Sequence, residues 1–193
     1  MGQITRRTRE LEGVAPDAIP YDELMAAEQP AVLKGLVRNW PLVQKESPAA
    51  AADYLKTFYQ GRPVTAFIAQ PEQGGRIGNT PDDTEHEFEA HTGELQEYQD
   101  ILIGQLEQDE DPTLYEGSND EDLFLTLLRG ENDLVLNHPM FEANPPLVGA
   151  WIGNRSTAKA HYDMSNNIAV CLVGRRRFTL FPPEQIENLY PGP

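Results

Sequence analysis

The residue types best suited to chemistry in this sequence are an imidazole and a carboxylate two positions apart. His161 and Asp163 flank Tyr162, shortly before an apolar run. On a half-buried strand, side chains two positions apart point to the same side, so His161 and Asp163 would share one face. A histidine and a carboxylate are two of the three ligands of the 2-His-1-carboxylate site that binds Fe(II). The tripeptide alone arises often by chance, so its surroundings must support this interpretation.

Three histidines upstream of His161 could in principle supply the second imidazole of such a site. The chain has four histidines, and none follows His161. His86 and His91 lie in a Gly-, Pro- and Asp-rich segment, residues 70–91, that predicts a long exposed loop in which histidines are usually solvated. His138 precedes Pro139, which favours local packing or capping over metal binding.

Helices and short strands are expected to position these residues. Helices are expected only in the first two thirds of the chain, and the last third is expected to consist of short strands. Ser47 and Pro48 predict the start of a helix that ends near Gly61. Helical patterns and capping signals predict helices from residue 20, over 49–59, over 95–106 and over 119–128. Apolar runs predict strands over 30–37, 64–68, 147–153, 168–173 and 178–181. Short strands joined by turns predict an antiparallel barrel or jelly roll, after an N-terminal arm over residues 1–19.

Composition restricts the classes of partner. The 193 residues suffice for one domain and carry a formal net charge of -16. Between Glu72 and Asp133 there are 19 acidic residues and only two arginines, which argues against binding to nucleic acid or an anionic membrane. This acidic segment is either a solvated surface or a lip that recruits basic peptides. The single cysteine, Cys171, and the lack of a long apolar run favour a cytoplasmic protein without a membrane span.

Several motifs together resemble a known family. They are W-I-G at 151–153, H-Y-D at 161–163, Asn167, G-R-R-R-F-T-L-F-P-P at 174–183, L-Y-P at 189–191, P-A-V-L-K-G-L at 30–36 and N-W-P at 39–41. In this combination, from about residue 20 onward, the chain resembles the cupin-like JmjC family. Its members include Fe(II)/2-oxoglutarate protein hydroxylases similar to the asparaginyl hydroxylase that inhibits hypoxia-inducible factor.

The resemblance implies a fold and a set of site residues. The implied fold is mainly β with α: a double-stranded β-helix, the cupin or jelly-roll barrel, over residues 20–193 after N-terminal helices. His161 and Asp163 match two iron ligands. Arg176 lies where the family usually has a lysine that binds the distal carboxylate of 2-oxoglutarate, and the hydroxyl of Tyr115 would contact the same carboxylate. Asn167 would lie near the co-substrate. Thr157 is a further co-substrate contact, next to Ala158, the position where some relatives carry a hydroxyl residue.

The resemblance also implies an activity. The family's third iron ligand is a histidine on a later strand, so we expect this chain to lack its C-terminal strands and to be the N-terminal part of a longer protein. We expect an Fe(II)/2-oxoglutarate-dependent dioxygenase that uses oxygen to hydroxylate a protein or peptide side chain, and that forms a homodimer as related domains often do. The alternatives are a non-catalytic cupin-like module that binds a ligand or partner, and a metal-binding cupin that acts without 2-oxoglutarate.

Overall fold

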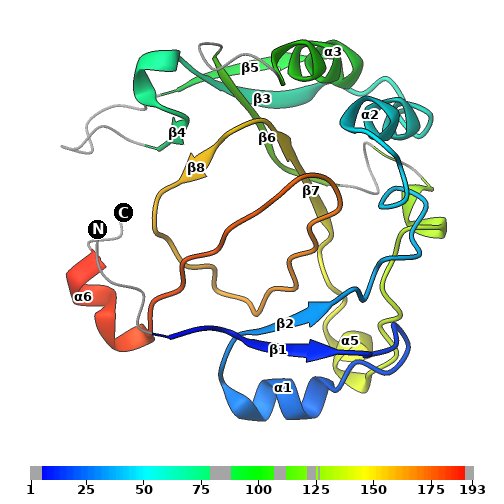
Figure 1. Cartoon of the computed structure of the whole chain (residues 1–193), viewed down its shortest axis with the longest axis vertical. Helices are drawn as coiled ribbons and strands as arrows, with labels where there is room; N and C mark the ends of the chain where they lie inside the picture. Colours follow the sequence, from blue (N-terminus) through cyan, green and yellow to red (C-terminus); the bar gives the residue numbers. More distant parts are fainter. Residues whose placement is uncertain (1–5, 79–87, 107–111, 121–124, 126, 190–193) are drawn as a thin grey trace.

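The computed structural model describes residues 6–78, 88–106, 112–120, 125 and 127–189. Figure 1 shows the chain from the N-terminus in blue to the C-terminus in red. Its strands are β1 Arg9–Glu12, β2 Ala31–Lys34, β3 Val64–Ala69, β4 Arg76–Ile77, β5 Glu89–Gly93, β6 Thr113–Asp120, β7 Gly149–Gly153 and β8 Thr157–Ala158. Its helices are α1 Tyr21–Ala27, α2 Pro48–Lys56, α3 Leu95–Gln105, α5 Pro139–Ala143 and α6 Ile186–Leu189, with short 3-10 turns η1 Pro71–Gln73, η2 Leu128–Gly130 and η3 Pro183–Gln185.

The largest sheet has four antiparallel strands in the order β5-β3-β6-β7. Two smaller sheets, β1-β2 and β4-β8, have two parallel strands each. The domain is therefore a mixed α/β structure built on an antiparallel sheet, and the predicted strands over 64–68 and 147–153 are confirmed as β3 and β7. The two parallel pairs differ from the wholly antiparallel arrangement that the sequence predicts.

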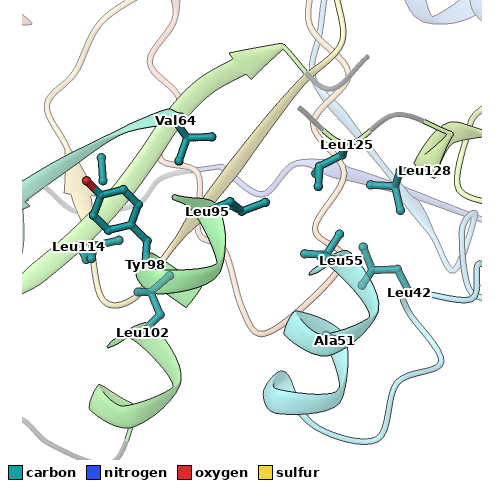
Figure 2. Close-up of a cluster of buried hydrophobic side chains, with 11 residues drawn as sticks. Leu42, Ala51, Leu55, Val64, Leu95, Tyr98, Leu102, Leu114, Leu125 and Leu128 are labelled. Atoms are coloured by element: carbon teal, nitrogen blue, oxygen red, sulfur yellow. The ribbon is translucent and has the colours of Figure 1, made fainter. Parts of the chain in front are cut away.

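Helices α2 and α3 cover one face of the large sheet. Ser47 caps α2 as predicted, because its hydroxyl oxygen accepts a 3.1 Å hydrogen bond from the Ala50 N–H. Leu95, Tyr98 and Leu102 of α3 recur at helical spacing and are buried. Figure 2 shows the resulting core between helices and sheet. Its buried members are Leu42, Ala51, Leu55, Val64, Ala66, Leu95, Tyr98, Leu102, Leu114, Leu125 and Leu128.

The opposite face of the sheet is turned toward residues 159–182. In Figure 1 this segment, orange to red, crosses between the large sheet and the β1-β2 pair. Leu172 packs against the edge of the core, so the segment contacts the main body of the domain.

The strands predicted over 161–163, 168–173 and 178–181 are absent, which corrects the sequence interpretation. Residues 159–182 contain no strand, and α6 follows them after η3. Residue preference alone does not make a strand, because its N–H and C=O groups need a neighbouring strand. Within the described ranges, β8 has only the two-residue β4 beside it, so the ladder ends at Ala158. The apolar side chains of Tyr162, Met164 and Phe178 accordingly stay exposed.

Three further predictions are corrected in part. Residues 9–12 of the expected arm form β1, because they pair in parallel with β2. The expected loop over 70–91 contains η1, β4 and the start of β5, while residues 79–87 lie outside the described ranges. The helix predicted over 119–128 is wrong at its described ends: β6 continues to Asp120, and Leu127 has a left-handed backbone with φ 72°.

None of the helices in the described ranges combines the length and the apolar composition that a segment crossing a bilayer needs.

Candidate metal and co-substrate site

His161 lies just after β8, in the irregular segment, and its side chain is exposed. Its Nδ1 lies 2.8 Å from the carbonyl oxygen of Lys159. A carbonyl oxygen can only accept, so Nδ1 carries the proton and donates. The lone pair is then on Nε2, where it is available to a metal ion.

Asp163 is held by a neighbour four positions along the chain. The Asn167 Nδ2 group donates a 2.6 Å hydrogen bond to Oδ2 of Asp163. The other carboxylate oxygen, Oδ1, remains as a donor atom for a cation. The side chains of Asp163 and Asn167 thus meet within an irregular segment and not along a strand.

Tyr115 and Arg176 are far apart in the sequence, but the charge of Arg176 acts on the Tyr115 hydroxyl. Tyr115 lies on β6 and is half-buried, on the sheet face opposite the helices, directly across from Phe67 of β3. Burial raises the pKa of the Tyr115 hydroxyl, and the positive charge of Arg176 acts in the opposite direction. The two side chains therefore lie within reach of each other's field, although each was proposed separately for the same carboxylate.

The remaining residues considered in the sequence lie apart from these pairs. Thr157, in β8, is exposed, and its N–H donates to the Gly75 carbonyl oxygen at 2.7 Å. His91 Nε2 lies 3.1 Å from Glu89 Oε2 on β5, and His86 lies outside the described residues. A hollow of about 370 Å³ is lined by Glu72, Gln73, Gly74 and Arg76, residues that the sequence analysis did not single out.

His138 caps a helix, as its position before Pro139 indicates. Its Nδ1 accepts a 3.2 Å hydrogen bond from the Met140 N–H at the start of α5, and its Nε2 lies 3.1 Å from Asp22 Oδ1. Both ring nitrogens are thus engaged, which leaves no lone pair for a metal ion.

The described residues contain no complete set of three metal ligands. In the part of the chain that the structure describes, no three His, Cys, Asp or Glu side chains group closely enough to hold a metal ion. The donors that His161 and Asp163 offer, one imidazole nitrogen and one carboxylate oxygen, nevertheless fit the preferences of Fe(II).

Glu116 is a charged residue that the sequence analysis missed. It is 0% exposed, on the helix-covered face of β6, and neither carboxylate oxygen has a hydrogen-bond partner among the residues that the structure describes. Burial raises the pKa of this carboxyl group to about 8. The alternation of side chains along a strand could have identified it: if Leu114 points into the core of the domain, Glu116, two positions further on, points there as well.

The fold is a mixed α/β domain with an antiparallel sheet, and the segment of residues 159–182, which carries His161, Asp163 and Arg176, crosses between this sheet and the β1-β2 pair. A model of the cupin-like domain family matches residues 16–193, and the chain belongs to this family, which includes Fe(II)/2-oxoglutarate oxygenases. A search of curated proteins finds none that matches the chain.

Proposed function

We propose that this protein is an Fe(II)/2-oxoglutarate-dependent oxygenase that hydroxylates a protein side chain. One observation supports this most: the positive charge of Arg176 acts on the Tyr115 hydroxyl, although the sequence separates the two residues widely. The resemblance assigns both residues to the same distal carboxylate, and a hydroxyl and a guanidinium suit a carboxylate because both donate hydrogen bonds and the guanidinium adds charge.

His161 and Asp163 would hold the metal ion through Nε2 and Oδ1. Lys159 and Asn167 keep these two donors in a fixed tautomer and orientation, as groups behind metal ligands commonly do. When bound, iron and 2-oxoglutarate supply the oxidation of a C–H bond by oxygen, with release of succinate and carbon dioxide. The residues of the chain bind the co-substrate, orient it and shield it from water.

The finer fold is part of the same proposal. We propose that the segment from His161 to Phe181 belongs to a double-stranded β-helix. The exposure of apolar side chains in this segment supports it: Met164 is 93% exposed, and Phe178 and Leu180 are more than half exposed. The specific similarity to the asparaginyl hydroxylase, and hence the type of side chain modified, belongs to this proposal too.

Succinate formation by the full-length gene product tests the function. With Fe(II), 2-oxoglutarate, oxygen and a peptide library, we expect succinate to form as 2-oxoglutarate disappears. Asp163→Ala should abolish this turnover. Arg177→Ala, which changes the neighbour of Arg176, should leave the turnover within about twofold of that of the unaltered protein. Absence of succinate from the unaltered protein, with iron and with any peptide, would contradict the proposal.

A second function, a cupin-like module that binds a ligand or partner without catalysis, is favoured by one observation. The described residues contain no three-donor metal group. Binding of 2-oxoglutarate separates the two functions, because an oxygenase should bind it far more tightly with metal than without. A binding module should show the same affinity in both conditions.

A further inference from the structure

Two glycines flank the ring of Tyr115. Gly153 of β7 lies directly opposite Tyr115 in the strand register, and a methyl group on Gly153 would be 3.2 Å from Tyr115 Cδ2. A methyl group on Gly117 would be 2.8 Å from Tyr115 Cε1. Cδ2 and Cε1 are opposite corners of the ring, so the two glycines leave the ring the space that it occupies on two sides.

Backbone conformation does not explain why these positions are glycines. The glycines with positive φ are Gly13, Gly35, Gly61, Gly74, Gly75 and Gly174, a set that excludes Gly117 and Gly153. Any residue could adopt the backbone angles at the latter two positions. What a side chain would lack there is space, and the space is occupied by the Tyr115 ring.

A β-bulge adds to this arrangement. Between the pairs Glu116–Ile152 and Asn119–Ala150, β6 has one residue more than β7. Gly117 lies within this bulge, and a bulge bends its strand and changes the direction of nearby side chains. Phe67 completes the surroundings, since its Cε2 would lie 3.6 Å from a methyl group on Gly117.

We infer, resting on the proposed function, that Gly117 and Gly153 are positioning residues: because they have no side chain, the Tyr115 ring can lie over them in an orientation that makes its hydroxyl available to the carboxylate bound by Arg176. The three atoms nearest to a methyl group at position 117 would all be side-chain atoms, from Tyr115 and Phe67. The ring would have to rotate or shift by several tenths of an ångström. At position 153 a methyl group would also lie 2.8 Å from the Leu114 carbonyl oxygen, so that change strains the sheet as well.

Gly117→Ala is therefore the sharper variant, and the chain offers two matched controls. Gly104 and Gly130 have no heavy atom within 4 Å of an added methyl group and no positive φ. In the full-length protein with metal and without oxygen, Gly117→Ala should weaken 2-oxoglutarate binding about tenfold while metal affinity is unchanged. Gly104→Ala and Gly130→Ala should bind 2-oxoglutarate normally. Normal binding by Gly117→Ala would overturn the inference.

A double-mutant cycle tests whether the glycine acts through the hydroxyl. In the Tyr115→Phe background, Gly117→Ala should cost less than twofold further affinity, because the group it displaces is already absent. An additional tenfold loss in that background would overturn the inference by showing an effect independent of the hydroxyl.

An NMR measurement shows whether the ring itself moves in a folded variant. With tyrosine-selective labelling, the Tyr115 ring signals should shift in Gly117→Ala and stay unchanged in Gly104→Ala, whose dispersed spectra also report that the variants are folded. Unchanged Tyr115 signals in folded Gly117→Ala would overturn the inference. If the unaltered protein binds no 2-oxoglutarate, the proposed function fails, whereas the NMR result still decides whether the glycine makes room for the ring.

Discussion

Asn167 donates a hydrogen bond of 2.6 Å from its side-chain amide to Oδ2 of Asp163. The two residues are four positions apart, in a segment without regular secondary structure. The bond fixes which carboxylate oxygen is engaged and which one is free. Because the backbone of this segment is not held by a sheet, this bond is what orients the proposed carboxylate ligand.

Asn167→Ala should therefore weaken metal binding by about 10- to 100-fold, the usual effect of removing a group that supports a ligand. Anaerobic titration of the full-length protein with Fe(II) measures it. Asn166→Ala, at an exposed neighbouring position, is the control and should bind iron normally. Equal affinities for both variants would show that the Asn167 bond has no role in holding the ligand.

Arg176→Ala should weaken 2-oxoglutarate binding while leaving metal affinity intact. A hydrogen bond to a charged group contributes about 1.5–3 kcal/mol, which corresponds to roughly ten- to a hundredfold in affinity. Arg176→Lys should lose less, because the charge remains but the paired geometry of the guanidinium is lost. Calorimetry with metal present measures both, with Arg177→Ala as control. A loss as large in Arg177→Ala would indicate a general effect of charge.

Glu116→Gln should remove a pH dependence of stability. The folded-state pKa of about 8 lies above the ordinary value of 4.5, so the folded protein binds more protons between these values. Stability is then greatest below pH 4.5 and falls as pH rises toward 8, by up to about 1.4 kcal/mol per pH unit. Denaturant unfolding from pH 5 to 8 should show this slope in the unaltered protein, relative to Glu116→Gln.

The exposed Glu97→Gln variant is the control for that experiment and should keep the slope. Other groups, histidines among them, also titrate between pH 5 and 8, so the difference between the unaltered protein and Glu116→Gln is the informative quantity. Parallel curves for these two proteins would show that Glu116 is not neutral in the folded state.

Asn132→Ala should destabilise the domain by about 1–3 kcal/mol, because it leaves a buried donor without a partner. Asn132 is 4% exposed; its Oδ1 accepts from the Leu42 N–H at 3.0 Å, and its Nδ2 donates to the Tyr54 hydroxyl and the Leu128 carbonyl oxygen. Thermal or denaturant unfolding measures the loss. Asn188→Ala, which removes an exposed hydrogen bond, should change stability by no more than about 0.5 kcal/mol.

The elements that the sequence predicted best are those with local causes. Helix α2 begins where Ser47 and Pro48 indicate, and α3 follows its apolar spacing. The strands predicted over 161–181 depend on partners distant in sequence, and without a ladder these residues stay irregular. At Asn119 a possible helix cap favoured a helix, but pairing with Ala150 of β7 keeps the residue in a strand.

Only some residues of the candidate site could be predicted from the sequence alone. His161 and Asp163 follow from residue type and spacing, whereas Arg176 and Tyr115 came from the family resemblance. No periodicity in the sequence relates Tyr115 to Arg176. The effect of the Arg176 charge on Tyr115 depends on the path that residues 159–182 take past the sheet. The two glycines beside Tyr115 were missed for a similar reason, since Gly153 approaches the ring from another strand.

The most direct test is equilibrium binding of Fe(II) to the full-length protein without oxygen. We expect one metal ion per chain in the unaltered protein and in His91→Ala, whose imidazole contacts Glu89 on β5. His161→Ala and Asp163→Ala should each reduce affinity at least 100-fold. Iron binding by these two variants that equals that of the unaltered protein would contradict the assignment of His161 and Asp163 as metal ligands.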